Sequence, residues 1–287
     1  SEVALRGLSA VAGALAVLPA YALGRALGGE RAGLLAALAT AASPYLLWYS
    51  QEARAFALLA LFSATLLFLT HRLSEQHSSS ASQRFALTSG QRRRDGGIKD
   101  PPPQGARFQG VASGQILSPT APALALWGMT AALVLYTHLY GAFTVAASAV
   151  FLLATVRARR LPLLLALAGA AAAYLPWLRV TLANNDPAQN WRAPATAGEL
   201  LGRSLAAVAH NGVLVEQVAV TAGTAITLLA LLGMAAAGRR GALLLGTAIA
   251  LPLAASYAIS LRQPIFSERY IIAIAIPGYI AASLGIA

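Results

Sequence analysis

Residues 121–156 read APALALWGMTAALVLYTHLYGAFTVAASAVFLLATV, an apolar run with one polar interruption near its centre. As a single straight helix the run would be about 54 Å long, whereas the hydrocarbon core of a membrane is only about 30 Å thick. The interruption holds Tyr136, Thr137 and His138, and Gly141 follows it, which favours a turn at this point. The run therefore predicts two membrane-spanning helices joined by a tight polar turn.

The composition of the whole chain also indicates a membrane protein. Its 287 residues are 57% hydrophobic and 11% charged, whereas a soluble domain is about 25% charged. These values exclude an ordinary soluble enzyme, a disordered protein and a coiled coil. Cysteine is absent, which excludes disulfides, thiolate metal sites and cysteine nucleophiles. Because the sequence opens on Ser1 and ends in an apolar run at Ala287, we expect it to be a segment of a longer protein.

Nine apolar runs have about the length of a transmembrane helix, which is roughly 17–25 residues. They are residues 8–24, 32–49, 55–70, 121–137, 139–156, 161–178, 218–237, 241–260 and 270–287. We therefore expect an all-α fold, a polytopic transmembrane helical bundle of about nine spans. Its parts are residues 1–70 with three spans, 71–120 as a flexible basic cytoplasmic linker without helical or strand period, and 121–287 with six spans and an outer loop at 179–217.

The arginine distribution predicts which way the bundle faces. With the N-terminus outside, the inner connections carry 14 basic and four acidic residues, a net charge of +10. The outer side carries seven basic and six acidic residues, a net charge of +1. Basic residues collect on the cytoplasmic side of membrane proteins, so this orientation is expected, with the protein integral to a bacterial inner (plasma) membrane. Because the basic residues follow membrane topology, no nucleic-acid partner is predicted.

Four polar stretches fall on the predicted outer side: residues 43–54, 136–141, 179–217 and 262–270. An ionisable residue at or within the membrane is costly to place and marks a candidate functional site. A purely structural bundle has no need of so many polar groups on one side. The outer face is therefore expected to hold the site.

The first of these stretches offers two interpretations. The planar guanidinium of Arg54 can bind a phosphate, and Glu52 beside it can orient that arginine, hold a metal or accept a proton. Alternatively, Arg54 and Glu52 are an interfacial anchor, with Trp48 and Tyr49 as part of an aromatic belt.

The other polar stretches of the outer side also contain residues that allow two interpretations each. His138 is either a proton carrier or phosphate ligand, or a hydrogen-bonded interfacial histidine. Arg269 and Tyr270 either grip a lipid phosphate or mark the membrane interface. Trp191 either stacks on a sugar ring or packs its own loop.

Several stretches, in their order along the chain, resemble a known family. They are 2–10 (EVALRGLSA), 23–25 (LGR), 43–44 (SP), 49–58 (YSQEARAFAL), 135–141 (LYTHLYG), 174–178 (YLPWL) and 266–270 (FSERY). The chain resembles the polytopic glycosyltransferases related to protein O-mannosyltransferases and to lipid A aminoarabinose transferases, that is, glycosyltransferase family 39 with the GT-C fold. The likeness covers most of the chain except residues 71–120.

The resemblance implies an integral-membrane glycosyltransferase that moves a hexosyl or pentosyl group from a polyprenyl-phosphate-linked donor to a protein, lipid or glycan acceptor on the outer face. The family's catalytic carboxylate lies in a loop before the segment that Glu2 opens, so we expect the base upstream of Ser1, with Glu52 as an assisting carboxylate. The expected substrate-binding residues are Arg54, Gln51, Tyr49, His138, Tyr136, Trp191, Arg269 and Tyr270.

Two other function classes remain as alternatives. One is a transporter or flippase of lipid-linked or anionic substrates, although transporters tend to show inverted repeats and charge near mid-membrane. The other is a non-catalytic membrane scaffold. The expected partners are the polyprenyl-phosphate-sugar donor, membrane lipid and the acceptor. No cofactor is predicted, and no cluster of carboxylates predicts a metal site, although a divalent cation stays open.

Overall fold

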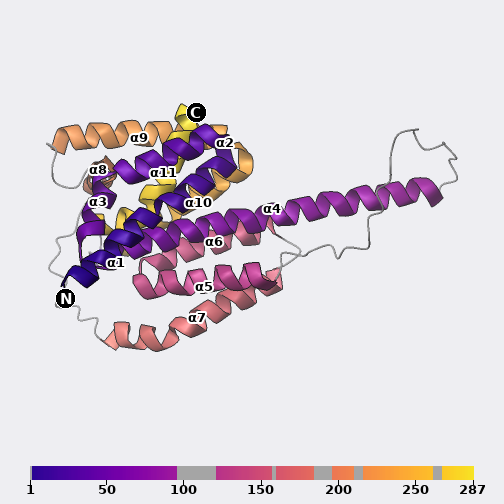
Figure 1. Ribbon diagram of the computed structural model, residues 1–287, viewed down its shortest axis with the longest axis horizontal. Helices are drawn as coiled ribbons and strands as arrows, with labels where there is room; N and C mark the ends of the chain where they lie inside the picture. The colour runs from indigo at the N-terminus through magenta and orange to yellow at the C-terminus, as the bar shows by residue number, and fades with distance from the viewer. Residues whose placement is uncertain (1, 96–120, 157–159, 184–195, 210–215, 261–266) are drawn as a thin grey trace.

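The computed structural model describes residues 2–95, 121–156, 160–183, 196–209, 216–260 and 267–287. Within these ranges the chain forms helices and no strand, which confirms the all-α prediction. The elements are α1 (Glu2–Leu15), α2 (Val17–Ala42), α3 (Pro44–Gln51), α4 (Phe56–Asp95), α5 (Ala121–Thr137), α6 (Gly141–Thr155), α7 (Arg160–Ala183), α8 (Ala197–Ala209), α9 (Glu216–Ala236), α10 (Gly238–Ser260), η3 (Glu268–Ile271) and α11 (Ile272–Ile286). Helices α4, α5 and α9 run roughly along the long axis of the molecule (Figure 1).

The first two predicted spans form a helical hairpin. Helix α2 reverses at Gly29, whose φ of 81° lies in the left-handed region that glycine adopts at little cost. The two arms then pack so closely that a Cβ added to Gly24 would lie 3.0 Å from the Cβ of Ala36. The apolar stretch Arg6–Ala42 therefore contains two predicted spans rather than one long one.

Six helical stretches are long and apolar enough to cross a membrane, judged by length and composition within the described residues. They are Arg6–Ala42, Phe56–Gln76, Arg160–Ala183, Gln217–Ala236, Gly238–Ser260 and Glu268–Ile286. Helices α5 and α6 are shorter apolar helices that coincide with the fourth and fifth predicted runs. The polytopic bundle is thus confirmed, while the count of nine spans stays a prediction.

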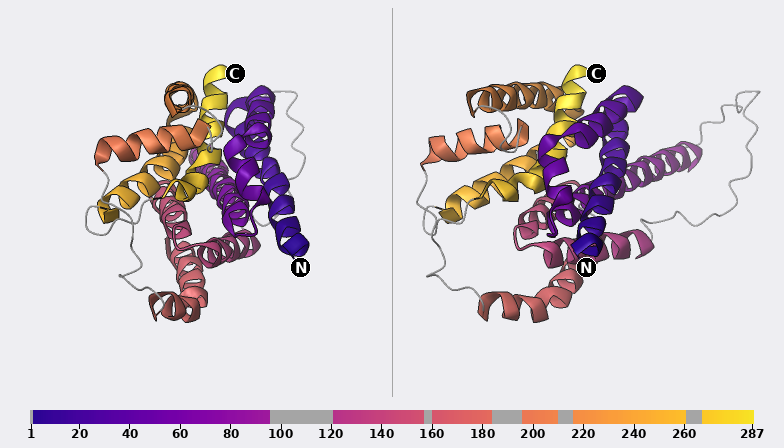
Figure 2. Two further views of the ribbon diagram at one scale, coloured as in Figure 1. Left: turned by 90° about the vertical axis from the view of Figure 1, so that its left-hand side faces the viewer. Right: turned by 60° about the vertical axis from the view of Figure 1, so that its left-hand side comes forward.

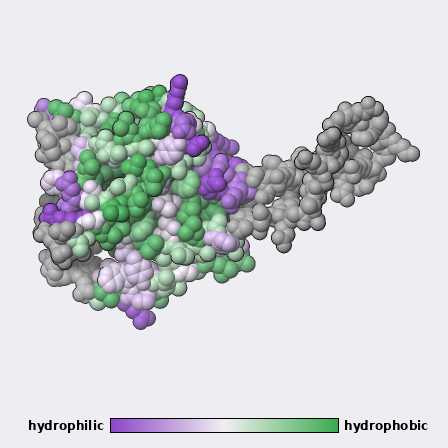
Figure 3. All heavy atoms as spheres, in the orientation of Figure 1, coloured by the Kyte–Doolittle hydropathy of each residue, from purple (hydrophilic) through white to green (hydrophobic). Residues whose placement is uncertain are grey.

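The outside of the bundle is apolar. Large hydrophobic side chains stay exposed there, with Leu161 at 68% and Leu182 at 63% exposure. Hydrophobic residues cover the middle of the face in Figure 3, and hydrophilic ones gather toward the point where α4 leaves the bundle. Contiguous exposed apolar surface marks a membrane or protein contact, and here it surrounds helices of membrane-spanning length. The protein is an integral membrane protein.

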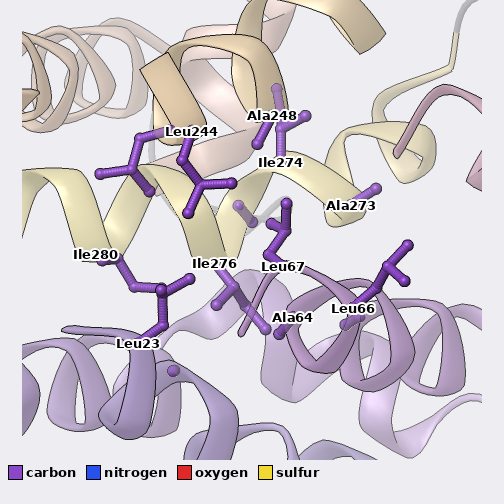
Figure 4. Close-up of a cluster of buried hydrophobic side chains, with 14 of the residues drawn as sticks. Leu23, Ala64, Leu66, Leu67, Leu244, Ala248, Ala273, Ile274, Ile276 and Ile280 are labelled. Carbon is purple, nitrogen blue, oxygen red and sulfur yellow. The ribbon is translucent and has the colours of Figure 1, made fainter. Parts of the chain in front are cut away.

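The core is organised around α11, which packs against α9, α2, α4 and α10. Its residues Ala275, Ile280 and Ala281 are fully buried. Figure 4 shows Ile276 and Ile280 of α11 near Leu23 of α2 and Ala64 of α4, with Leu244 of α10 on another side. Because η3 leads directly into α11, this central helix positions the residues of η3.

Two predicted connections prove to contain helix. Helix α4 continues to Asp95 and leaves the bundle (Figures 1 and 2), so the expectation of no helical structure from residue 71 on is wrong for residues 71–95. Leu73 and Ser74 are still buried, and extending an existing helix costs far less than nucleating one. Residues 96–120 lie outside the described residues. In the predicted outer loop at 179–217, α7 runs to Ala183 and α8 is an additional helix.

Candidate functional site

Helix α3 begins at a local capping signal. The Ser43 hydroxyl accepts a hydrogen bond from the amide of Leu46 at 3.2 Å, and Pro44 occupies the first helical turn. A serine N-cap followed by proline is a favoured helix start, so α2 ends and α3 sets off in a new direction. Tyr45 then donates its hydroxyl to the backbone oxygen of Glu268 in η3. This bond ties the first predicted polar stretch to the fourth.

The segment after α3 holds the Glu52 and Arg54 side chains in one small network. The Trp48 indole donates to Glu52 Oε1 at 3.1 Å, and Arg54 Nη1 lies 3.7 Å from Glu52 Oε2. Ser9 of α1 donates its hydroxyl to the Arg54 backbone oxygen at 3.1 Å. The Arg54 side chain is 56% exposed, so its guanidinium is oriented by Glu52 and still faces outward.

Tyr49 does not take part in an exposed aromatic belt. It is 6% exposed, and its ring lies 5.1 Å from that of Tyr45 and 5.2 Å from that of Phe56, both in edge-on geometry. Trp48, in contrast, is half exposed. The belt interpretation therefore fits Trp48 alone, and Tyr49 connects α3 to the first residue of α4.

His138 lies in the predicted tight turn, between α5 and α6. The turn is closed by the Gly141 amide, which donates to the His138 backbone oxygen at 2.8 Å. The imidazole lies 5.6 Å from the Phe56 ring and 4.9 Å from the Tyr270 ring, measured between centroids. The second predicted polar stretch thus meets the first and the fourth.

The electrostatics of this turn favour a neutral histidine. Burial lowers the pKa of His138 below its usual value, and the positive charge of Arg269 lowers that pKa further. The Tyr140 amide donates to His138 Nδ1 at 3.1 Å, which places the proton of the neutral ring on Nε2. His138 is therefore set up to offer an N–H to a neighbour rather than a full positive charge.

The short helix η3 supplies the other half of the cluster. The Arg269 guanidinium carbon lies 6.0 Å from the centre of the Phe56 ring, within the range of a cation–π contact. Tyr270 stacks on Tyr140 with ring centroids 4.0 Å apart and planes inclined by 21°. We call Tyr49, Phe56, His138, Tyr140 and Tyr270 the aromatic cluster.

Helix α8 approaches η3 from the third polar stretch. Arg203 Nε donates to Glu268 Oε1, one residue before Arg269. The start of α8 is a reciprocal cap, since the Thr196 amide donates to Glu199 Oε2 at 2.7 Å and the Glu199 amide donates to the Thr196 hydroxyl at 3.3 Å. The Thr196 amide and hydroxyl, which both donate to the Glu199 carboxylate, lower the pKa of that carboxylate.

The structure brings most, but not all, of the predicted site residues together. Tyr49, His138, Arg269 and Tyr270 meet through Phe56 and Tyr140, and Glu52, Arg54 and the exposed Gln51 lie on the segment that leads into Phe56. Tyr136 instead points to α7, where its hydroxyl donates to the Ala173 backbone oxygen at 2.7 Å. Trp191 lies outside the described residues.

Sequence reasoning missed four residues of this region: Phe56, Tyr140, Arg203 and Glu268. Arg203 counted only as a charge of the outer side, and Tyr140 and Glu268 only as members of the polar stretches 136–141 and 262–270. Phe56 counted only as part of the stretch 49–58 and of the predicted span 55–70. Their roles depend on contacts between distant segments, which spacing along the chain does not reveal.

An apolar groove of about 360 Å³ runs behind α3, between α2, α8, α9 and α11. Leu38, Val208 and Leu229 contribute to its walls, and Ser43 and Tyr279 line it near the start of α3. Tyr279 donates its hydroxyl to the Val208 backbone oxygen at 2.7 Å and lies 2.8 Å from the Ser43 hydroxyl. Most of the residues that line the groove are apolar.

The charged side chains at this end of the bundle are suited to phosphate binding. Among the described residues, no group of three or more histidine, aspartate or glutamate side chains is arranged to hold a metal ion. Arg269 contacts the aromatic cluster, which includes the neutral imidazole of His138, and Arg54 lies on the segment that leads into it. Guanidinium groups pair with phosphate oxygens through charge-assisted hydrogen bonds.

The first part of the chain matches a known protein family. Residues 1–86 match the family model of dolichyl-phosphate-mannose-protein mannosyltransferases. The match confirms the resemblance to these membrane glycosyltransferases over a segment that contains α1, α2, α3, Arg54 and Phe56. No curated protein and no solved structure matches the chain.

Proposed function

We propose that this protein is a glycosyltransferase that moves a sugar from a polyprenyl-phosphate carrier to a protein, lipid or glycan acceptor. One observation supports this most directly. In the segment that matches the mannosyltransferase family, Arg54 follows the third helix and Phe56 begins the fourth. From outside that segment, His138 and Arg269 both lie against Phe56, and Tyr270 lies against His138. Mannose is the first sugar to test, because the matched family uses a mannosyl donor.

The two arginines fit the demands of such a transfer. Breaking the bond between the sugar and the carrier phosphate leaves negative charge on that phosphate, and preoriented donors stabilise it. Arg269 is held against Phe56, and Arg54 is oriented by Glu52. In this proposal both guanidinium groups bind the carrier phosphate, and the Nε2–H of His138 donates to another oxygen of the same phosphate.

The surroundings fit a lipid-linked donor. The apolar groove behind α3 accommodates part of the polyprenyl tail, while the phosphate stays near the aromatic cluster. The excess of basic residues on the opposite connections supports a site that faces the outer side of the membrane. The acceptor would approach from that side, where Gln51 and Arg54 are exposed.

Replacement of Arg54 tests the proposal. The full-length protein in proteoliposomes is supplied with polyprenyl-phosphate mannose and an acceptor peptide or lipid, and mannose transfer is measured. A hydrogen bond to a charged group contributes about 1.5–3 kcal/mol, so Arg54→Ala should lower kcat/KM about 10- to 100-fold.

Arg31→Ala is the matched control, because Arg31 is an exposed arginine at the hairpin turn of α2, away from the cluster. It should transfer mannose at the wild-type rate. An Arg54→Ala protein that matches wild-type turnover removes the assigned role of Arg54. A wild-type protein that transfers no sugar from any polyprenyl-phosphate donor, but moves the donor across the membrane, favours the flippase alternative.

A further inference from the structure

Helix η3 is a single turn whose last residue leads into α11 and whose first residue is held by two other helices. Its first residue, Glu268, is held twice: Tyr45 of α3 donates to its backbone oxygen, and Arg203 of α8 donates to its carboxylate. The Tyr270 amide donates to the Ser267 backbone oxygen at 3.0 Å. Glu268 is therefore the junction through which α3 and α8 act on the next two residues, Arg269 and Tyr270.

The Arg203–Glu268 ion pair is poorly explained as a stabilising contact. Its side chains are 41% and 39% exposed, and ion pairs at that exposure contribute little to stability. The position of the ion pair indicates its role better than its small contribution to stability does. It links a helix outside the aromatic cluster to the residue that precedes Arg269 in a turn too short to hold its own shape.

We propose that Arg203 and Glu268 are positioning residues, which hold η3 so that Arg269 stays over Phe56 and Tyr270 stays on Tyr140. This inference rests on the proposed function for its catalytic consequence. Without the pair, η3 turns away from the cluster and the Arg269 guanidinium loses its fixed place at the donor phosphate. The fold of the bundle stays intact, because α11 is held by its own packing.

Cysteine labelling tests the structural part of this proposal without any substrate. The chain has no cysteine, so Ser267→Cys introduces a unique thiol next to Glu268, at a position that is 6% exposed. N-ethylmaleimide should label this thiol slowly in an otherwise unchanged protein. With Arg203→Ala or Glu268→Gln added, labelling should become at least about tenfold faster, because the open state is more populated.

Two controls separate a local change from general unfolding. The exchanged pair, Arg203→Glu with Glu268→Arg, should restore slow labelling. A thiol at Ser283→Cys in α11, where exposure is 2%, should stay protected in every variant. The same exchange at Arg25 and Glu30, an ion pair of 3.0 Å at the hairpin turn, should leave labelling of Ser267→Cys unchanged.

Kinetics with polyprenyl-phosphate mannose test the catalytic part. Arg203→Ala and Glu268→Gln should each raise the KM for the donor and also lower kcat, so that kcat/KM falls about tenfold, because Arg269 binds the phosphate before the reaction and stabilises the charge that develops on it during transfer. The exchanged pair should recover most of the wild-type KM. A loss caused only by unfolded protein would lower kcat at constant KM.

Wild-type labelling rates in both single variants would overturn the proposal, as would an exchanged pair that labels as fast as the single variants while the Ser283→Cys thiol stays protected. A wild-type protein that transfers no sugar refutes the proposed function instead. In that case the labelling rates still decide whether the pair holds η3.

Discussion

The contact between α9 and α11 leads to a sharp prediction about Gly233. A Cβ added at this position would lie 2.7 Å from the backbone nitrogen of Gly285 and closer still to the backbone oxygen of Ala281. Uncharged heavy atoms need about 3.5 Å, so Gly233→Ala must push the two helices apart by more than about 1 Å. Because α11 carries η3 at its start, this shift also reaches the candidate site.

Two opposing effects determine how much Gly233→Ala changes the free energy of unfolding. Alanine is favoured over glycine inside a helix by about 1 kcal/mol. Overpacking a tight contact costs about 1–3 kcal/mol, and here both obstructing atoms belong to backbone, which cannot rotate away. The cost should therefore lie in the upper part of that range, about 2–3 kcal/mol, so that, after the gain in helix propensity, Gly233→Ala should lower the free energy of unfolding by about 1–2 kcal/mol.

The measurement is an SDS titration in mixed micelles, followed by tryptophan fluorescence, because Trp127 is completely buried in the folded state. Gly278→Ala is the matched control on α11, since a Cβ there meets nothing within 4 Å. It should be neutral or stabilising by up to about 1 kcal/mol. If Gly233→Ala proves as stable as Gly278→Ala, the close approach of α9 and α11 is wrong.

Two further predictions concern pH and the start of α8. The folded-state pKa of His138 lies below the usual 6.5 because of burial and the charge of Arg269, so the unfolded state takes up the proton first and stability is lost as pH falls below about 6.5. His138→Gln should flatten thermal-unfolding midpoints measured between pH 7 and 5. Thr196→Ala removes an N-cap, which typically costs about 1 kcal/mol. Because the folded-state pKa of Glu199 is lowered, the stability that its ionised carboxylate contributes is lost as pH falls below about 4.5. Thr196→Ala should therefore also weaken the acid dependence of stability below that pH.

The helices could largely be predicted from the sequence because apolar length is a local property. Each predicted run overlaps a helix, and the turn around His138 lies where the polar interruption stands. Local composition predicts helix positions less well where tertiary contacts determine the structure. It missed α8, whose cap consists of Thr196 and Glu199, and it ended the third span at residue 70 although α4 remains packed beyond it.

The candidate site could be predicted only as a region. Charge placement and the resemblance pointed to one end of the bundle, and Tyr49, His138, Arg269 and Tyr270 do meet there. Tyr136 seemed equivalent to His138 because it precedes it by two residues. Since successive residues of a helix end face different directions, it packs instead against Tyr174 of α7, with ring centroids 5.6 Å apart.

Phe56 explains why packing, more than charge, organises this end of the bundle. Its ring contacts Tyr49 from α3, His138 from the α5–α6 turn and Arg269 from η3. An arginine held over an aromatic face keeps its charge and its donors but loses side-chain freedom. A phosphate that binds such an arginine pays less of the ordering entropy that weakens binding to a flexible one. If the proposed function is right, Phe56 thus prepares Arg269 for the donor phosphate, a role that the distribution of charges alone does not reveal.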